Sequence, residues 1–338
     1  MNYIYKSIIF FTLILIFYSC SNESNKEKHQ NNRNNIVNVK DRVHEIKIEN
    51  VLIGSTARLY LMKNFLLVGD YKSITNLIHI FDKNNFKYLT SCAPIGQGPS
   101  EITNMGHIGI DNANRKFYVT DHGKQKIFSY DLDSVLLNHG YIPKVKTGMN
   151  NKQFPSTYYF INDTLCIGRI IAPTGNSGYN EFIAKWSMVT GEIRPMKYKH
   201  PDIEKRRVTF AVSNINNNYV ECYTYHDLMT ICDLSGKLLY NIYGPEWDKT
   251  ESKKTLYYNS VIFCGNKIIT SYSGKDNFSK DYLPTKLIVF NANGDYIQTL
   301  ETGYKISDFC YDEEHDRIIM NLDDVIQFGY IDLKDLNK

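Results

Sequence analysis

The sequence lacks the features that mark several common classes of protein. Lysine and arginine number 39 against 36 aspartates and glutamates, so a net charge of +3 suggests no surface suited to nucleic acid. The 7 cysteines form no Cys-x-x-Cys pair and no spacing with histidine that is typical of zinc sites. Beyond residue 40, no stretch sustains the apolar periodicity of a helix. We therefore expect a strand-rich chain that binds no nucleic acid and no zinc.

Motifs for catalysis and cofactor binding are also missing. The segment Ile95–Glu101, with the sequence IGQGPSE, does not lead from a strand into a helix, so it is not a phosphate loop. A hydrolase needs a nucleophile beside a base, and no such pair is evident. The sequence therefore favours a protein that is not an enzyme, and it predicts no cofactor.

Most of the cysteines lie in, or at the end of, strand-like segments, where a free thiol behaves as a small buried apolar side chain. These cysteines are Cys92, Cys166, Cys222, Cys232, Cys264 and Cys310. Cys222 and Cys232 are out of direct register across the turn at Tyr225-His226, so no disulfide is predicted.

What the chain does contain is a hairpin that recurs about six times. In one copy, residues 286–290 are mostly apolar, Asn293-Gly294 signals a tight turn, and residues 296–300 resume the apolar pattern. Each copy follows a second kind of hairpin, such as Val261–Ile269. Two hairpins make a four-stranded antiparallel sheet, and the units start roughly 40–60 residues apart, the period of propeller blades. The predicted fold is all-β, a six-bladed β-propeller.

The blades hide their edges only if the ring closes. The last unit, from Val325 onward, lacks an outer strand, whereas Val43–Ile48 alternates apolar and polar residues ahead of the first blade. We predict that Val43–Ile48 joins Val325–Ile331 as the outer strand of the last blade; a free tether is the alternative. The propeller would then occupy residues 43–338, after a flexible tether at 20–42.

The N-terminus has the layout of a secretory signal that ends at a lipid-anchor cysteine. A short basic start precedes an apolar run from Ser7 to Tyr18, too short to span a bilayer comfortably, and then Ser19-Cys20. We expect residues 1–19 to be removed and Cys20 to carry a lipid that anchors the protein in the cell envelope. An uncleaved signal anchor or ordinary cleavage is the alternative. Residues 21–35 contain almost no apolar side chain, so they are expected to be disordered.

Long loops concentrate on one face of the predicted disc. In blades of strands a to d, the a–b and c–d turns share one face, and the b–c and d–a loops share the other. The long segments of the second set are Ala172–Asn180, Ser273–Thr285, Ala93–Met105, Lys144–Pro155, His200–Arg207 and Gly244–Thr255. Insertions on one face of a repeat array often mark its binding face.

Two groups of candidate ligand-binding residues lie in these loops. Gly96-Gln97-Gly98, with Glu101, could expose backbone N–H groups to a ligand, although the same residues suit a tight link between blades. The ring-bearing candidates are His122, Tyr225 and His226, since exposed rings stack on sugars and peptide side chains. With 26 tyrosines in the chain, chance placement is an equal alternative. The basic residues between Lys197 and Arg207 are interpreted as a solvated loop.

A third group is expected near the axis, where the inner strands begin. The residues at these positions are Arg58, His107, Tyr158, Thr209, Asn259 and Asp308. Arg58, His107 and Asp308 are the candidates for ligand contact. A single carboxylate among them is too few for a calcium site, which needs six to eight oxygen ligands. No metal is predicted.

The chain resembles the TolB-like six-bladed β-propeller lipoproteins of Bacteroidetes. The resemblance rests on the anchor residue Cys20, the crossover Gly96–Glu101 and the second strand Phe117–Asp121, and it spans roughly residues 43 to 333. It implies a protein of the cell envelope, attached to the inner or the outer membrane, and it brings no activity or site residues with it.

These observations favour a non-enzymatic binding module, monomeric, that presents its long-loop face to a glycan, peptide or protein. The alternative is a propeller hydrolase or lyase with an axial active site. A purely structural scaffold is a third possibility.

Overall fold

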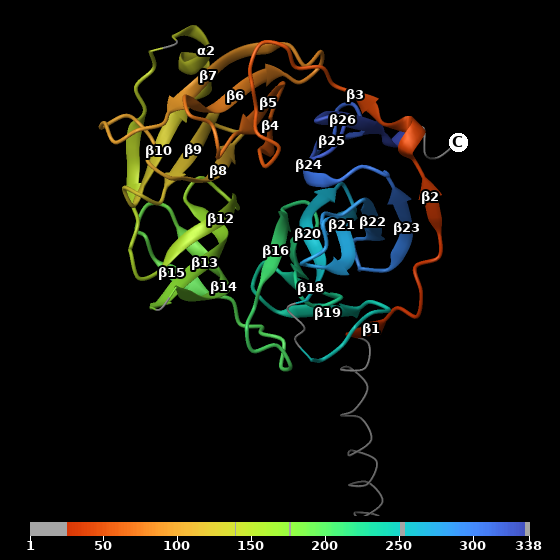
Figure 1. Cartoon of the computed structure of the whole chain (residues 1–338). Helices are drawn as coiled ribbons and strands as arrows, with labels where there is room; N and C mark the ends of the chain where they lie inside the picture. The colour runs from red at the N-terminus through yellow and green to blue at the C-terminus, as the bar shows by residue number, and fades with distance from the viewer. Residues whose placement is uncertain (1–25, 139, 176, 251–253, 335–338) are drawn as a thin grey trace, which may run out of the picture.

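Six sheets surround a central axis in the computed structural model, which describes residues 26–138, 140–175, 177–250 and 254–334 (Figure 1). The prediction of a six-bladed β-propeller is confirmed. The described residues include no helix that is long and apolar enough to cross a membrane. Residues 1–19 and Cys20 lie outside the described residues, so the signal peptide and the lipid anchor stay predictions.

The first three blades have four strands each, in sequence order from the axis outward. Blade 1 consists of β4 (Arg58–Met62), β5 (Phe65–Gly69), β6 (Asn76–Asp82) and β7 (Tyr88–Pro94). Blade 2 consists of β8 (Met105–Asp111), β9 (Lys116–Asp121), β10 (Lys126–Asp131) and β11 (Lys144–Gly148). Blade 3 consists of β12 (Phe154–Phe160), β13 (Leu165–Gly175), β14 (Gly178–Ser187) and β15 (Ile193–Pro195).

The last three blades each recruit a strand from the N-terminal segment. Blade 4 consists of β16 (Val208–Ser213), β17 (Asn218–Tyr223), β18 (Leu228–Asp233) and β19 (Leu238–Tyr243), with β1 (Glu27–His29) outside them. Blade 5 consists of β20 (Thr255–Cys264), β21 (Lys267–Asp276), β22 (Lys286–Asn291) and β23 (Tyr296–Glu301), with β2 (Ile36–Asn38) outside them. Blade 6 consists of β24 (Ile306–Asp312), β25 (Arg317–Leu322), β26 (Phe328–Asp332) and β3 (His44–Glu45).

The second strands of the blades are buried on both faces because each blade packs between two neighbours. All six residues of β17 and all six of β25 are buried. The core is therefore divided into clusters between adjacent blades, such as the one that joins Met62 and Leu67 of blade 1 to Phe117 of blade 2. The six cysteines within the described residues are free and buried in these layers.

The hairpin turn at Asn293-Gly294 shows why the repeat uses glycine there. Gly294 has a φ of 80°, in the left-handed region, and a Cβ at this position would lie 2.6 Å from the side chain of Ile242. A larger residue would therefore meet both backbone strain and a steric clash with the neighbouring blade.

The N-terminal segment closes the ring, as predicted. In β3, His44 pairs with Tyr330 and Glu45 with Gly329 of β26, and the Ile46 N–H donates to the Phe328 carbonyl at 2.9 Å. The imidazole of His44 also stacks on the ring of Tyr330, with centroids 5.0 Å apart. The paired stretch is shorter than the predicted Val43–Ile48, but it supplies the missing outer strand.

The prediction of a flexible tether up to residue 42 is wrong for residues 26–42. This segment, which we call the strap, runs along the outside of blades 4 and 5 (Figure 1). Its β1 and β2 pair in parallel with β19 and β23, and the 3-10 helix η1 (Lys40–Arg42) follows. The outer strands of the blades offer unpaired backbone groups, and the strap satisfies them, for example through the Val39 N–H to the Glu301 carbonyl at 2.9 Å.

Three of the predicted loops are partly β-structure. Residues 144–148 form the outer strand β11 of blade 2, reached through the short helix α2 (Leu132–Leu137). Much of 172–180 is a hairpin extension of β13 and β14, and β21 continues through Asp276, so it includes the first four residues of 273–285. These insertions therefore include projecting β-arms, and only part of each is irregular.

Candidate functional site

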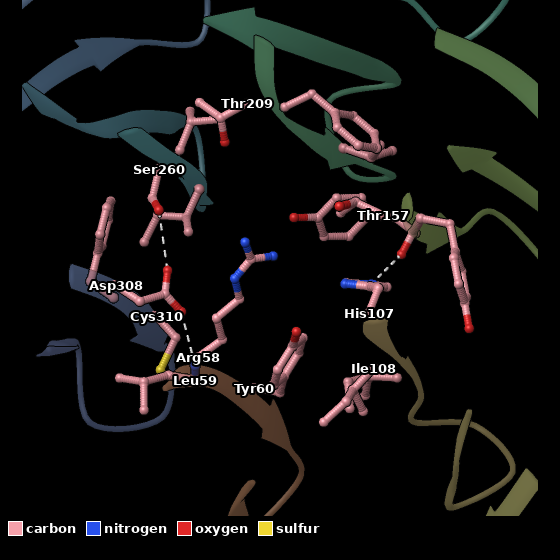
Figure 2. Close-up of a pocket in the computed structure, with 18 of the residues that line it drawn as sticks. Arg58, Leu59, Tyr60, His107, Ile108, Thr157, Thr209, Ser260, Asp308 and Cys310 are labelled. Atoms are coloured by element: carbon pink, nitrogen blue, oxygen red, sulfur yellow. Dashed lines mark hydrogen bonds between the residues drawn. The ribbon is translucent and has the colours of Figure 1, made fainter. Parts of the chain in front are cut away.

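A cavity of about 600 Å³ lies on the axis, and the inner strands of all six blades line it (Figure 2). The residues expected to converge at the axis do so: Arg58, His107, Tyr158, Thr209, Asn259 and Asp308 all line it. Each belongs to the first strand of a different blade, near the face that carries the d–a loops. Antiparallel blades bring these positions together because every first strand starts at the same end of the axis.

Arg58 extends from β4 into the middle of this cavity (Figure 2). Its side chain is exposed to the cavity, and its guanidinium carbon lies 5.4 Å from the centroid of the Tyr71 ring. The phenol of Tyr71 contributes most to raising the pKa of Arg58, while burial acts against the charge. The hydroxyl of Tyr71 is in turn hydrogen-bonded to that of Tyr60 at 2.9 Å.

A second guanidinium, that of Arg169, reaches the cavity from β13. Its Nη1 donates to the Val208 carbonyl at 2.7 Å, and its Nε donates to the Ser156 hydroxyl at 3.0 Å. Burial lowers the pKa of Arg169, the negative charge of Glu181 opposes this effect, and the positive charge of Arg58 adds to it. An arginine remains protonated in proteins, so the cavity holds two positive charges that repel each other. Sequence reasoning missed Arg169 because only the starts of the inner strands were considered.

Neither guanidinium forms an ion pair with a carboxylate within the described residues. Asp308 is the one carboxylate among the described residues that line the cavity, and protein donors already engage both of its oxygens. Oδ2 accepts from the Leu59 N–H at 2.8 Å, and Oδ1 accepts from the Ser260 hydroxyl at 3.1 Å. Burial raises the pKa of Asp308. Asp308 thus braces blade 6 against blades 1 and 5.

His107 forms part of the cavity wall. Its Nε2–H donates to the Tyr158 carbonyl at 2.8 Å, which fixes the tautomer, and the rings of Tyr60 and Tyr158 pack edge-on against it. Burial, assisted by the charges of Arg58 and Arg169, lowers the pKa of His107 to about 3. The imidazole is therefore neutral at pH 7 and is not a base poised for catalysis.

The crossover Gly96–Glu101 is engaged in its own hydrogen bonds. The Glu101 carboxylate accepts from the Gly98 N–H at 2.7 Å, and the Gly96 N–H donates to the Ile102 carbonyl at 3.0 Å. Lys124 donates to the carbonyls of Gly98 and Glu101. The Gln97 side chain is exposed. These contacts fit the tight link between blades, and Gly96, Gln97, Gly98 and Glu101 are not among the residues that line the axial cavity.

The ring-bearing candidates also lie away from the axial cavity. His122 packs on Phe154, with centroids 5.2 Å apart, at the junction of blades 2 and 3. Tyr225 and His226 line a separate hollow of about 390 Å³ beside Trp247, and the His226 ring lies 5.7 Å from that indole. The candidates are therefore divided among four places on the disc, and Arg58, His107 and Asp308 are the set that the fold brings together at the axis.

The interpretation of the basic run as a solvated loop is wrong for one of its members. Arg206 is buried, and its Nε lies 3.4 Å from a carboxylate oxygen of Glu221, which is fully buried in β17. Burial raises the pKa of Glu221. The arginine turns inward because an uncompensated carboxylate inside blade 4 would be costly.

Comparison with known proteins supports the same architecture. Residues 27–160 match the model of the DUF5128 family, which is described as a 6-bladed beta-propeller. The chain is a six-bladed β-propeller. No curated protein matches it.

Two solved structures with similar folds illustrate the likeness. A member of the DUF4221 family from Bacteroides vulgatus ATCC 8482 has 12% identity and a TM-score of 0.57, over 86% of this chain and 94% of that one. Regucalcin from Agrobacterium tumefaciens strain C58, a calcium-binding protein, has 9% identity and a TM-score of 0.54, over 88% of this chain and 94% of that one. At these identities the likeness shows the fold alone.

Proposed function

We propose that this protein is an envelope-anchored binding module, and that its axial cavity holds a small ligand or the end of a glycan or peptide. The observation that carries the proposal is the pair Arg58 and Arg169, two guanidinium groups that face a cavity of about 600 Å³ and form no ion pair with a carboxylate among the described residues. Ligand sites of small molecules have volumes of roughly 300–1,000 Å³ and a few convergent polar groups. The ligand would enter from the face with the long loops.

The chemistry of the cavity favours binding over catalysis. A hydrolase or lyase would need a base near a reacting atom, but the His107 Nε2–H is committed to a carbonyl, and Asp308 is committed to Leu59 and Ser260. Calcium, which regucalcin binds, does not suit this cavity, because the one carboxylate among the described cavity residues lies beside the guanidinium of Arg58.

The envelope location is part of the same proposal. It rests on the signal-like residues 1–19, on Cys20 and on the resemblance to TolB-like lipoproteins of Bacteroidetes. Cys20→Ser should move the protein from the membrane fraction to the soluble fraction. Membrane association that survives this substitution would contradict the lipid anchor.

The binding proposal is tested with the full chain and a panel of small acids, phosphates, sugars, amines and short peptides. The reporter is the NMR signal of the His107 imidazole, assigned by comparison with His107→Gln. At least one class should shift this signal saturably, and no compound should be turned over. A panel that leaves His107 unmoved, or a compound that is converted to product, would contradict the proposal.

A further inference from the structure

The axial cavity has a polar surface near one face of the disc and an apolar surface toward the other face. Near the long-loop face, its wall includes Arg58, Thr157, Thr209 and Asn259. Toward the opposite face, five blades each contribute one half-buried apolar side chain: Leu61, Ile110, Phe160, Val212 and Ile262. We call these five residues the apolar ring. Asn112 and Asn214 lie beyond it, at the start of the a–b turns.

The two ends are separated along the strands by a few residues. Arg58 and Leu61 are three positions apart on β4, as are Thr209 and Val212 on β16. At about 3.3 Å per residue, the polar end lies roughly 10 Å from the apolar ring. A ligand that spans the cavity therefore meets both surfaces.

Hydrogen-bond donors are in excess at the polar end. A guanidinium carries five N–H donors and no acceptor. Arg58 projects its group into the cavity without an ion-pair partner among the described residues. Arg169 adds a second group, whose nitrogens each donate one hydrogen bond to Ser156, Val208 or Thr157, so that two of its five N–H donors remain. The phenols of Tyr60 and Tyr71 are paired with each other, and the Asp308 oxygens are engaged. The missing chemical partner is thus an acceptor with negative charge.

The apolar ring favours contact with an apolar part of a ligand. Its side chains are only half-buried, although they belong to the interior of the disc. Contact of apolar side chains with water is unfavourable, so an apolar group that covers them is stabilised by about 25 cal/mol per Å² of buried surface. A fully hydrophilic ligand, such as a free sugar, would leave this surface wet.

We propose that the axial cavity binds an amphipathic anion, with its carboxylate or phosphate group against Arg58 and Arg169 and an apolar body of about 10 Å on the apolar ring. This assignment rests on the proposed function, since it names the ligand class of the same cavity. Carboxylate and phosphate share the chemistry that a guanidinium pair recognises, namely paired oxygens with negative charge. The arms of the experiment separate them.

The first test compares head groups on one alkyl chain. The full chain is titrated calorimetrically with octanoate, octyl phosphate, octanol and octylamine, and a titration without protein is the blank. At least one anion should bind about 10- to 100-fold more tightly than octanol, as expected for charge-assisted hydrogen bonds. Octylamine should bind more weakly than octanol. The ratio of the dissociation constants of octanoate and octyl phosphate shows which head group the cavity prefers.

The second test varies the length of the acid from butanoate to octanoate. Each methylene should tighten binding about fourfold until the apolar ring is covered. Val212→Thr, which replaces a methyl group by a hydroxyl at similar volume, should reduce the gain in affinity for each added methylene. Val189→Thr is the matched control, because Val189 is 61% exposed in the turn between β14 and β15, the outer strands of blade 3, and it should change nothing.

The third test removes the charge. Arg58→Gln should weaken the binding of octanoate about 10- to 100-fold and leave the binding of octanol unchanged within about twofold. Arg194→Gln is the control, because Arg194 pairs with Glu192 in an exposed position. Arg58→Lys keeps the charge and should lose less affinity than Arg58→Gln, which makes the result readable if the glutamine variant does not fold.

The outcomes separate this inference from the proposed function. If octanol binds as tightly as both anions, or if Arg58→Gln binds octanoate as the unmodified protein does, the anion assignment is overturned. If chain length has no effect, the apolar part of the assignment is overturned. A saturable shift of the His107 signal by a sugar or an amine in place of these acids would sustain the binding module and reject this ligand class. If no compound shifts the NMR signal of His107, both the binding module and the proposed ligand class are rejected.

Discussion

Arg33 of the strap and Asp227 of blade 4 form a buried ion pair, with Nη1 and Oδ1 3.0 Å apart. The side chains are 8% and 0% exposed. Arg33 Nη2 also donates to the Tyr258 hydroxyl at 2.9 Å, and the guanidinium carbon lies 5.3 Å from the centroid of the Tyr272 ring. A residue 194 positions away in the chain, counting from 33 to 227, thus fastens the strap into the junction of blades 4 and 5.

This contact predicts that Arg33→Ala destabilises the fold strongly. Removing one partner of a buried pair leaves the other charge uncompensated, which costs about 3–5 kcal/mol. Urea titration of the full chain measures the free energy of unfolding. Lys28→Ala is the control, because Lys28 pairs with the half-exposed Asp295 and should cost less than about 1 kcal/mol. Equal stabilities of the two variants would mean that Arg33 does not hold the strap.

Closure of the ring predicts a second effect on stability. Ile46 is 6% exposed and lies next to the paired residues of β3, so Ile46→Ala should cost about 2–4 kcal/mol through lost burial and the cavity it leaves. Leu52→Ala removes the same kind of side chain at a position that is 95% exposed, and it should change the free energy of unfolding by no more than about 0.5 kcal/mol. If both substitutions are neutral, the outer strand does not close the last blade.

His107 predicts a dependence of stability on acid pH. Its pKa is lowered from 6.5 to about 3 in the folded chain. As pH falls below 6.5, the unfolded chain gains a proton that the folded chain does not, so stability declines until the folded pKa is reached. At pH 5 the loss from this residue is about 2 kcal/mol, and at pH 7 it is small.

Two measurements check the histidine. The NMR shift of the His107 imidazole should stay constant between pH 7 and pH 5, while an exposed histidine titrates. Urea unfolding of His107→Asn should lose less stability over the same range than the unmodified chain. If the imidazole of His107 titrates near pH 6.5, it is not buried in the way that the structure shows.

The crossover after blade 1 predicts stability without a role in ligand binding. Glu101→Ala leaves the Gly98 N–H without its acceptor, which should cost about 1–3 kcal/mol. Gln97→Ala, at an exposed side chain, should be nearly neutral. Both variants should bind the axial ligand with unchanged affinity in calorimetry. A loss of affinity in folded Glu101→Ala would return the crossover to the list of ligand-binding residues.

The blades and their number could be predicted because apolar alternation and turn residues such as Asn293-Gly294 are local signals. The axial convergence of Arg58, His107 and Asp308 followed from the blade geometry alone. The strap could not be predicted in the same way. Residues 36–38 are too short a strand to show a period, and their pairing depends on the free edge of β23, which exists only in the fold.

Arg169 shows a second limit of sequence reasoning. It interrupts the apolar run Leu165–Ile171 of β13, and a lone charge in such a run is a signal that something must compensate for it. The direction of the side chain, toward Val208 and the axis, depends on contacts with blade 4. Similarly, the local sequence around Arg206 predicts a solvated basic loop, because its partner Glu221 lies in another segment.

The central claim is that the axial cavity binds an anion through Arg58. A crystal structure of the full chain with octanoate at saturating concentration tests it most directly. The account predicts carboxylate oxygens about 2.7–2.9 Å from the guanidinium nitrogens of Arg58, and an alkyl chain directed toward Val212 and Ile262. An acid bound elsewhere on the disc, with none in the axial cavity, would contradict it.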